Sequence, residues 1–101
     1  MNNWKNLQEL IEYPSSGILS KEVSKTDKFD ATLFILAKGT ELSEHTSTRE
    51  GVVYVIEGKG KFDLEGEAIP MTPGMLIHMK KNAIHSLTAE DNTAFILYLL
   101  N

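Results

Sequence analysis

The 101-residue chain contains no cysteine. This excludes disulfide bonds, zinc–thiolate sites, iron–sulfur clusters and catalysis by a cysteine nucleophile. Any bound metal must therefore be held by imidazole and oxygen donors, and the chain has only three histidines. A small domain without disulfide bonds must be stabilised by one efficient hydrophobic core, to which a second copy of the chain can contribute.

Long apolar runs and clusters of basic residues are also missing. No apolar segment approaches the roughly 20 residues needed to span a bilayer, and the first 13 residues lack the pattern of a signal peptide. The formal net charge is −4, so neither nucleic acid nor a membrane is expected as a main partner. We therefore expect a cytoplasmic protein of ordinary globular composition.

Residues 1–17 are expected to form a short N-terminal helix followed by a turn. Asn2 or Asn3 can cap this helix. Pro14 disfavours helix at the residue before it, and Gly17 permits a turn. The apolar residues that recur at helical spacing are Trp4, Leu7, Leu10 and Ile11.

From residue 18 to residue 101, turn residues recur regularly between short segments rich in Val, Ile, Phe and Tyr. Gly58, Gly66, Gly74 and Asn82 follow one another at eight-residue intervals. Short strands with this spacing are typical of an antiparallel sandwich or barrel. The predicted strands are 18–24, 31–37, 41–45, 52–57, 61–64, 67–71, 76–79, 85–89 and 94–100.

Two of these segments, 52–56 and 94–100, are apolar along nearly their whole length. A strand that faces water on one side alternates apolar and polar residues, whereas these strands need cover on both faces. The N-terminal helix can supply part of that cover and a symmetric partner subunit the rest, so we expect a homodimer. The alternative is an apolar stripe that remains exposed.

One segment combines glycine and histidine at a characteristic spacing. His45 follows Gly39 by six residues and precedes Ser47 by two, and a strand that begins near Gly51 ends at Gly58. A second segment carries a Pro-Gly turn at positions 73 and 74, then a predicted strand and a histidine at position 85.

Together these two segments resemble the two motifs of the cupin superfamily, over roughly residues 30–100. The resemblance implies a small single-domain cupin with an all-β fold. Its architecture would be an antiparallel jelly-roll (double-stranded β-helix) barrel, here with a short N-terminal helix. Such barrels are commonly dimeric and have a pocket lined by the motif positions.

In metal-binding cupins, three histidines and one glutamate hold an ion such as iron, manganese or zinc. By the resemblance, those four positions are His45, Ser47, Gly51 and His85 in this chain. A serine hydroxyl is a weak neutral ligand and glycine has no side chain. Two imidazoles alone bind a divalent transition metal weakly, so we expect a weak or degenerate metal site at His45 and His85.

Glu50 is the candidate for a third metal ligand. It lies one residue before the motif's glutamate position, so strand alternation normally points it to the opposite face. A bulge at Gly51 could re-aim it inward. His78 lies between two residues expected in the core, and we therefore expect it to project outward as a surface or interface histidine.

The function expected first is the binding of a small molecule in the barrel, with the residues His45, Ser47, His85, Val53 and Val55 lining the pocket. The alternative to a functional site is a pair of buried histidines whose hydrogen bonds are satisfied inside the barrel. The functional alternative is a metal-dependent cupin enzyme of dioxygenase or isomerase type that uses His45 and His85. A metal-free enzyme would use one of these histidines as general base. The sequence shows no carboxylate to orient such a base, so no catalytic residue is assigned.

Overall fold

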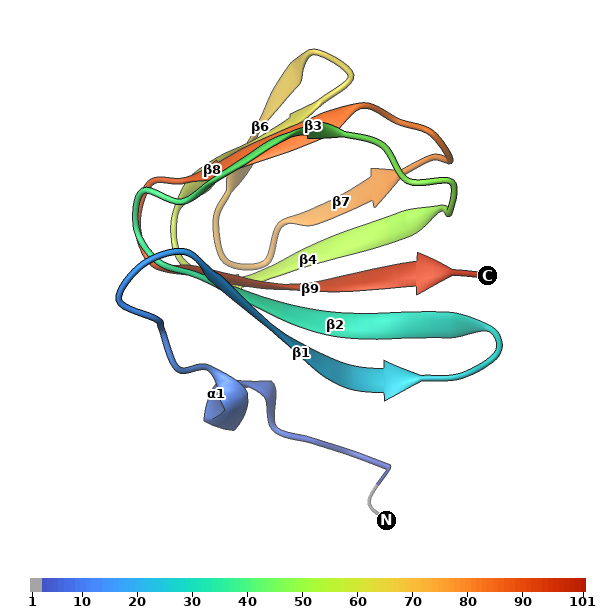
Figure 1. Ribbon diagram of the computed structural model, residues 1–101, viewed down its shortest axis with the longest axis horizontal. Helices are drawn as coiled ribbons and strands as arrows, with labels where there is room; N and C mark the ends of the chain where they lie inside the picture. The colour runs from blue at the N-terminus through green and yellow to red at the C-terminus, as the bar shows by residue number, and fades with distance from the viewer. Residues whose placement is uncertain (1–2) are drawn as a thin grey trace.

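The computed structural model describes residues 3–101 and shows two antiparallel β-sheets packed face to face (Figure 1). One sheet has the strand order β1-β2-β9-β4-β7 and the other has the order β3-β8-β5-β6. This jelly-roll arrangement confirms the predicted fold class. The strands are β1 Ile18–Lys25, β2 Phe29–Leu36, β3 Glu41–His45, β4 Gly51–Glu57, β5 Gly60–Leu64, β6 Glu67–Met71, β7 Leu76–Met79, β8 His85–Ala89 and β9 Thr93–Leu100.

All nine predicted strands are present. Four of them, β3, β6, β7 and β8, have the predicted bounds, four others differ by one residue at one end, and β2 begins two residues and ends one residue earlier than predicted. The agreement arises because several strands are bounded by turn residues with a backbone conformation that a strand cannot accommodate. Gly58, Gly66, Gly74 and Asn82 all have positive φ angles, and each lies outside the strands.

The N-terminal helix is shorter than expected. Helix α1 spans only Leu7–Leu10, and its cap is Asn6, whose Oδ1 accepts a hydrogen bond from the Gln8 N–H at 3.0 Å. Asn3 lies in a bend instead of capping the helix, and Asn2 lies outside the described residues. No helix among the described residues has the length and hydrophobicity needed to cross a membrane.

The helix ends early because the residues after it are extended and lie across the five-stranded sheet. The Lys21 ammonium on β1 donates to the Leu10 carbonyl at 2.7 Å, and the Tyr13 hydroxyl donates to Glu57 on β4 at 2.6 Å. Strands β2 and β9 lie between β1 and β4, so residues 10–13 cross the outer face of these two strands. The buried residues of that face are Leu33, Ile35, Ala94 and Ile96.

The main core fills the space between the sheets. Strand β4 shows the underlying alternation, since Val53 and Val55 are fully buried while Tyr54 is exposed on the outer face. Strand β8 does the same from the other sheet with His85, Leu87 and Ala89. The remaining large members of this core are Leu36, Phe62, Met71, Ile77, Met79 and Phe95.

Gly58 marks the tightest approach between two turns of the fold. Its φ angle is +113°, a conformation that side chains rarely adopt. A Cβ atom there would lie 2.5 Å from the Asn92 carbonyl oxygen and from the Thr93 Cα. Both are backbone atoms, so they cannot move aside as the end of a flexible side chain can.

We expect Gly58→Ala to destabilise the protein by about 3 kcal/mol, because it combines backbone strain with a clash against the backbone. Gly39→Ala is the matched control: Gly39 also has a positive φ, +87°, but nothing lies within 4 Å of its Cβ position. Strain alone should cost the control about 1 kcal/mol. Urea unfolding midpoints measure both, and equal losses would show that the close approach at Gly58 is unimportant.

Candidate functional site

The structure brings His45 and His85 into contact. His45 is the last residue of β3 and His85 the first of β8, and they lie directly opposite each other in the antiparallel pairing. Their ring centroids are 4.1 Å apart, with 62° between the ring planes. Two histidines that are 40 positions apart in the sequence therefore meet at one end of the sandwich.

A β-bulge in β3 places His45 on the correct face. Leu42 pairs with Leu87 and His45 pairs with His85, so three steps along β3 match two steps along β8. Regular alternation would put His45 on the face opposite to Leu42. The extra residue reverses this and turns the His45 ring toward the same side as Leu87.

Each ring is fixed by a hydrogen bond to the backbone two residues before it. The Nδ1 atom of His45 lies 2.8 Å from the Ser43 carbonyl oxygen, and Nδ1 of His85 lies 3.0 Å from the Ala83 carbonyl oxygen. A carbonyl oxygen can only accept, so Nδ1 carries the proton in both rings. In the neutral form of such a ring, Nε2 is the acceptor atom.

His85 is the more buried member of the pair. Its exposed fraction is 8%, while His45 is exposed, and its ring stacks on Phe62 with a centroid distance of 5.8 Å. Burial lowers the pKa of His85, and the nearby His45 lowers it further against the opposing effect of the Ala83 carbonyl. The ring is consequently held neutral near pH 7.

The other motif residues do not join the pair as metal donors. The Ser47 hydroxyl accepts a hydrogen bond from the Arg49 N–H at 3.1 Å. Gly51 pairs in register with both Met79 and Leu99, so no bulge re-aims Glu50. Glu50 bonds instead to Nε2 of His78, at 2.5 Å and on the outer surface.

The donors near the pair do not make a complete metal site. Within residues 3–101, no group of three His, Cys, Asp or Glu side chains is placed to hold one ion. The motif's glutamate position is also filled: a Cβ on Gly51 would lie 3.0 Å from Leu99 Cδ2 and from the Tyr98 carbonyl, and 3.4 Å from Met79 Cε. A resident metal held by four protein ligands does not fit this arrangement.

Two open cavities border the strands that carry the pair. One, of about 500 Å³, has Leu64 and Ala83 in its wall, and Leu64 lies directly opposite His85 in the β5–β8 pairing. The other, of about 430 Å³, lies over β3 and β8. The predicted pocket residues Val53 and Val55 are 1% and 0% exposed, within the packed core.

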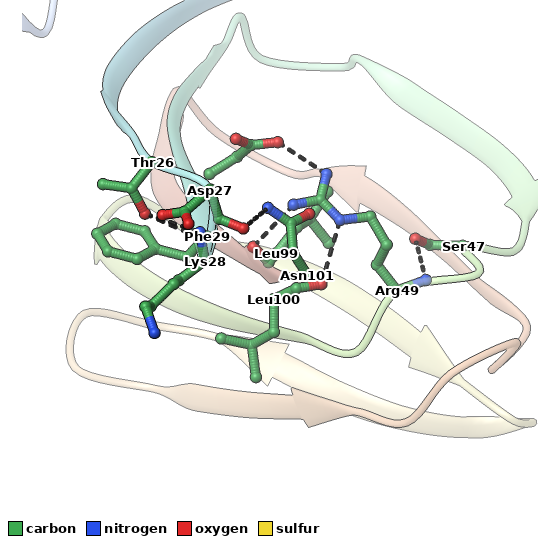
Figure 2. A network of polar contacts seen from close by, with 10 residues as sticks. Thr26, Asp27, Lys28, Phe29, Ser47, Arg49, Leu99, Leu100 and Asn101 are labelled. Carbon is green, nitrogen blue, oxygen red and sulfur yellow. Dashed lines mark hydrogen bonds and ion pairs between the residues drawn. The ribbon is translucent and has the colours of Figure 1, made fainter.

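Arg49 anchors the connection between β3 and β4, as Figure 2 shows. Its guanidinium group donates to the Leu99 carbonyl at 3.0 Å and the Leu100 carbonyl at 3.2 Å, and it pairs with the Asp30 carboxylate at 2.7 Å. Arg49 thus links the end of β9 and the beginning of β2 to the segment that follows His45.

The segment between β3 and β4 also supports the loop that precedes β8. The Ser47 carbonyl accepts a hydrogen bond from the Asn82 N–H at 2.7 Å. Asn82 is followed by Ala83, the residue whose carbonyl fixes the His85 ring. Arg49, Ser47 and Asn82 therefore connect the supports of both histidines. Sequence spacing gave no signal for this link, because it depends on backbone atoms.

Comparison with known proteins supports the fold. A sequence model of the cupin domain family matches residues 32–100, and a search of curated proteins found no match. A conserved protein of unknown function from Streptococcus pyogenes has a TM-score of 0.88 at 21% identity, with 100% of this chain and 89% of that one covered. An RmlC-like cupin from Desulfovibrio desulfuricans has a TM-score of 0.87 at 21% identity, with 99% of this chain and 97% of that one covered. A cupin 2 conserved barrel domain protein from Leptotrichia buccalis has a TM-score of 0.88 at 28% identity, with 96% of this chain and 47% of that one covered.

We expect Arg49→Met to destabilise the protein by about 2 kcal/mol, since it leaves Asp30 without its ion partner and two backbone carbonyls without a donor. The thermal midpoint should fall by about 10 °C. Lys61→Met is the control, because it removes an exposed ion pair with Asp63 at 3.7 Å that should contribute under about 1 kcal/mol. Similar midpoints for the two variants would contradict the anchoring role.

Proposed function

The chain belongs to the cupin family, and on that premise we propose that it binds a small molecule at the His45–His85 pair. One observation carries this proposal. Two imidazole rings that are far apart in the sequence lie in contact on neighbouring strands, and the backbone holds Nδ1 of each ring, which leaves Nε2 for a ligand. Small-molecule sites typically combine apolar walls with a few oriented polar groups of this kind.

The cavity of about 500 Å³ is the proposed entry to the pair. Its volume lies within the range of roughly 300–1,000 Å³ usual for ligand sites. Leu64 in its wall is the cross-strand neighbour of His85, and Ala83 supplies the carbonyl that orients the His85 ring. Neither His45 nor His85 lines this cavity, whose remaining wall residues are Glu65, Glu67, His78, Lys80 and Lys81. The proposed route to the His85 ring therefore passes the Leu64 side chain, which is partly buried.

A metal-dependent enzyme is the second candidate, and one observation favours it. Histidines that ligate metals usually donate their other ring N–H to a carbonyl or carboxylate, as both rings do here. The donor set opposes it, since Ser47 and Gly51 replace two of the four ligands that metal-binding cupins carry. Two imidazoles would hold a divalent ion weakly, and His45 and His85 would be its protein ligands.

Metal content distinguishes the two candidates. We expect protein purified without chelator to carry far less than one equivalent of manganese, iron, nickel or zinc. We further expect that titration of these ions shows weak binding that is lost in His45→Ala and in His85→Ala. His78→Ala is the comparison variant, because the His78 ring lines the same cavity but is paired with Glu50 and not with His45 or His85. Near-stoichiometric metal that disappears in both site variants and persists in the control would establish the metal-dependent alternative.

We also propose that a second copy of the chain covers the exposed part of the five-stranded sheet. Residues 10–13 cover the outer face of β2 and β9, but not that of β4 and β7. There Tyr54 and Leu76 are direct cross-strand neighbours with exposed fractions of 43% and 64%, and Tyr98 on β9 is 40% exposed. A contiguous apolar patch on a small domain is a typical site of symmetric association.

Leu76→Glu places a charge in the middle of this patch and should shift the protein from dimer to monomer. Sedimentation equilibrium at micromolar concentration should give twice the chain mass of 11.3 kDa for the unmodified protein and the single mass for the variant. Ile84→Glu is the matched control, since Ile84 is 47% exposed but lies in the loop before β8. A single chain mass for the unmodified protein would contradict the proposal.

A further inference from the structure

We infer that Glu65 is a positioning residue for His85, and that it acts through the peptide group that joins Ala83 to Ile84. The His45–His85 pair thereby gains an orienting carboxylate that the sequence did not reveal. The inference rests on the proposed function for its meaning, because the ring that Glu65 positions is one of the two rings proposed to bind the ligand.

One planar peptide group connects the Glu65 carboxylate to the His85 ring. At one end, the Ile84 N–H donates a hydrogen bond to Glu65 Oε1 at 3.1 Å. At the other end, the Ala83 carbonyl oxygen lies 3.0 Å from Nδ1 of His85. Because a peptide group is rigid and planar, a tilt of its N–H end also turns its carbonyl end. The carboxylate that holds the N–H therefore sets the direction in which the carbonyl meets the ring.

The backbone holds Glu65 next to His85. Leu64 lies directly opposite His85 in the β5–β8 pairing, and Glu65 is the residue that follows Leu64. The Glu65 N–H also donates to the Ile84 carbonyl at 2.8 Å. Both the main chain and the side chain of Glu65 are thus bonded to Ile84, the residue between Ala83 and His85.

The backbone conformation of Glu65 is unfavourable for a glutamate. Its φ angle is +50°, and that of Gly66 is +83°. Leu64 pairs with Glu67, so these two residues form a two-residue hairpin loop between β5 and β6. Positive φ angles at both positions are typical of a type I′ turn, which favours Asn or Asp before Gly. Residues held in such a strained conformation are concentrated at functional sites.

No surface ion pair accounts for a glutamate at this position. Within the part of the chain that the structure describes, Glu65 takes part in no ion pair, although Lys80 and Lys81 line the same cavity of about 500 Å³. Its carboxylate bonds instead to a backbone N–H of the loop before β8. The geometry therefore favours a role in orienting that loop.

Variants at Glu65 separate positioning of the ring from stability of the turn. Glu65→Asn supplies a residue that the turn prefers, but its side chain is one methylene shorter, so its oxygen no longer reaches the Ile84 N–H. Glu65→Gln keeps an oxygen acceptor at the original reach and removes the charge. Glu67→Gln is the matched control, because Glu67 is also exposed and lines the same cavity.

The readouts are taken on the full chain without any ligand. We expect a nuclear Overhauser effect between the ring protons of His45 and His85, whose centroids are 4.1 Å apart, in the unmodified protein, in Glu65→Gln and in Glu67→Gln. Glu65→Asn alone should lose it, and its Ile84 N–H should exchange with solvent about tenfold faster. The urea unfolding midpoint of Glu65→Asn should nevertheless equal or exceed that of the unmodified protein, since the turn gains stability.

Ring contacts that persist in Glu65→Asn would overturn the inference, because the peptide group would then keep its direction without the carboxylate. Loss of the contacts in Glu67→Gln, or their absence in Glu65→Gln, would overturn it as well, since the effect would follow charge. A lower urea midpoint for Glu65→Asn would show a general role in stability and would also contradict it. Failure in any of these ways leaves the proposed function standing, because no readout involves a ligand. Conversely, the metal-content measurement tests that function and does not depend on how the ring is oriented.

Discussion

The hydrogen-bonded register between β3 and β8 is the constraint on which the candidate site depends. It pairs His45 with His85, and the bulge after Leu42 turns His45 to the inner face. A shift by one residue would send the His45 ring to solvent and leave His85 alone beside Phe62. The chemistry of the pair is therefore determined by the backbone, since the same pairing also positions the carbonyls that fix the proton on each ring.

Only a few residues outside β3 and β8 hold the segments that flank the two histidines in place. Arg49 joins the ends of β2 and β9 to the segment after His45, and the Ser47 carbonyl holds Asn82 in the loop before His85. On the outer face of the five-stranded sheet, residues 10–13 are extended where the expected short helix would have continued. An extended segment can lie flat across two strands and reach Glu57 through Tyr13, which explains why the helix stops after one turn.

The sequence was sufficient for the fold and for half of the site. Turn residues at eight-residue intervals defined nine strands, and the spacing around His45 and His85 led to the cupin family, which the family match confirms. Strand alternation also anticipated that His78 faces outward. Neither the β3 bulge nor the Arg49 anchor could be predicted, because the bulge has no residue signature here and the anchor binds backbone carbonyls. Helix periodicity at Leu7 and Leu10 overestimated α1, because tertiary contacts of residues 10–13 outweigh local propensity.

At Gly51, neighbouring side chains fill the space that a glutamate ligand would need. A deleted glutamate would leave a void beside the histidines, which an added metal ligand or water could fill. Instead, Leu99 and Met79 close the space around Gly51, and even a Cβ atom would press on the Tyr98 carbonyl. Restoring a glutamate there requires apolar side chains to move out of a packed row, at a cost of about 1–3 kcal/mol. The packing around Gly51 is consistent with a site in which the two histidines act without a third protein ligand.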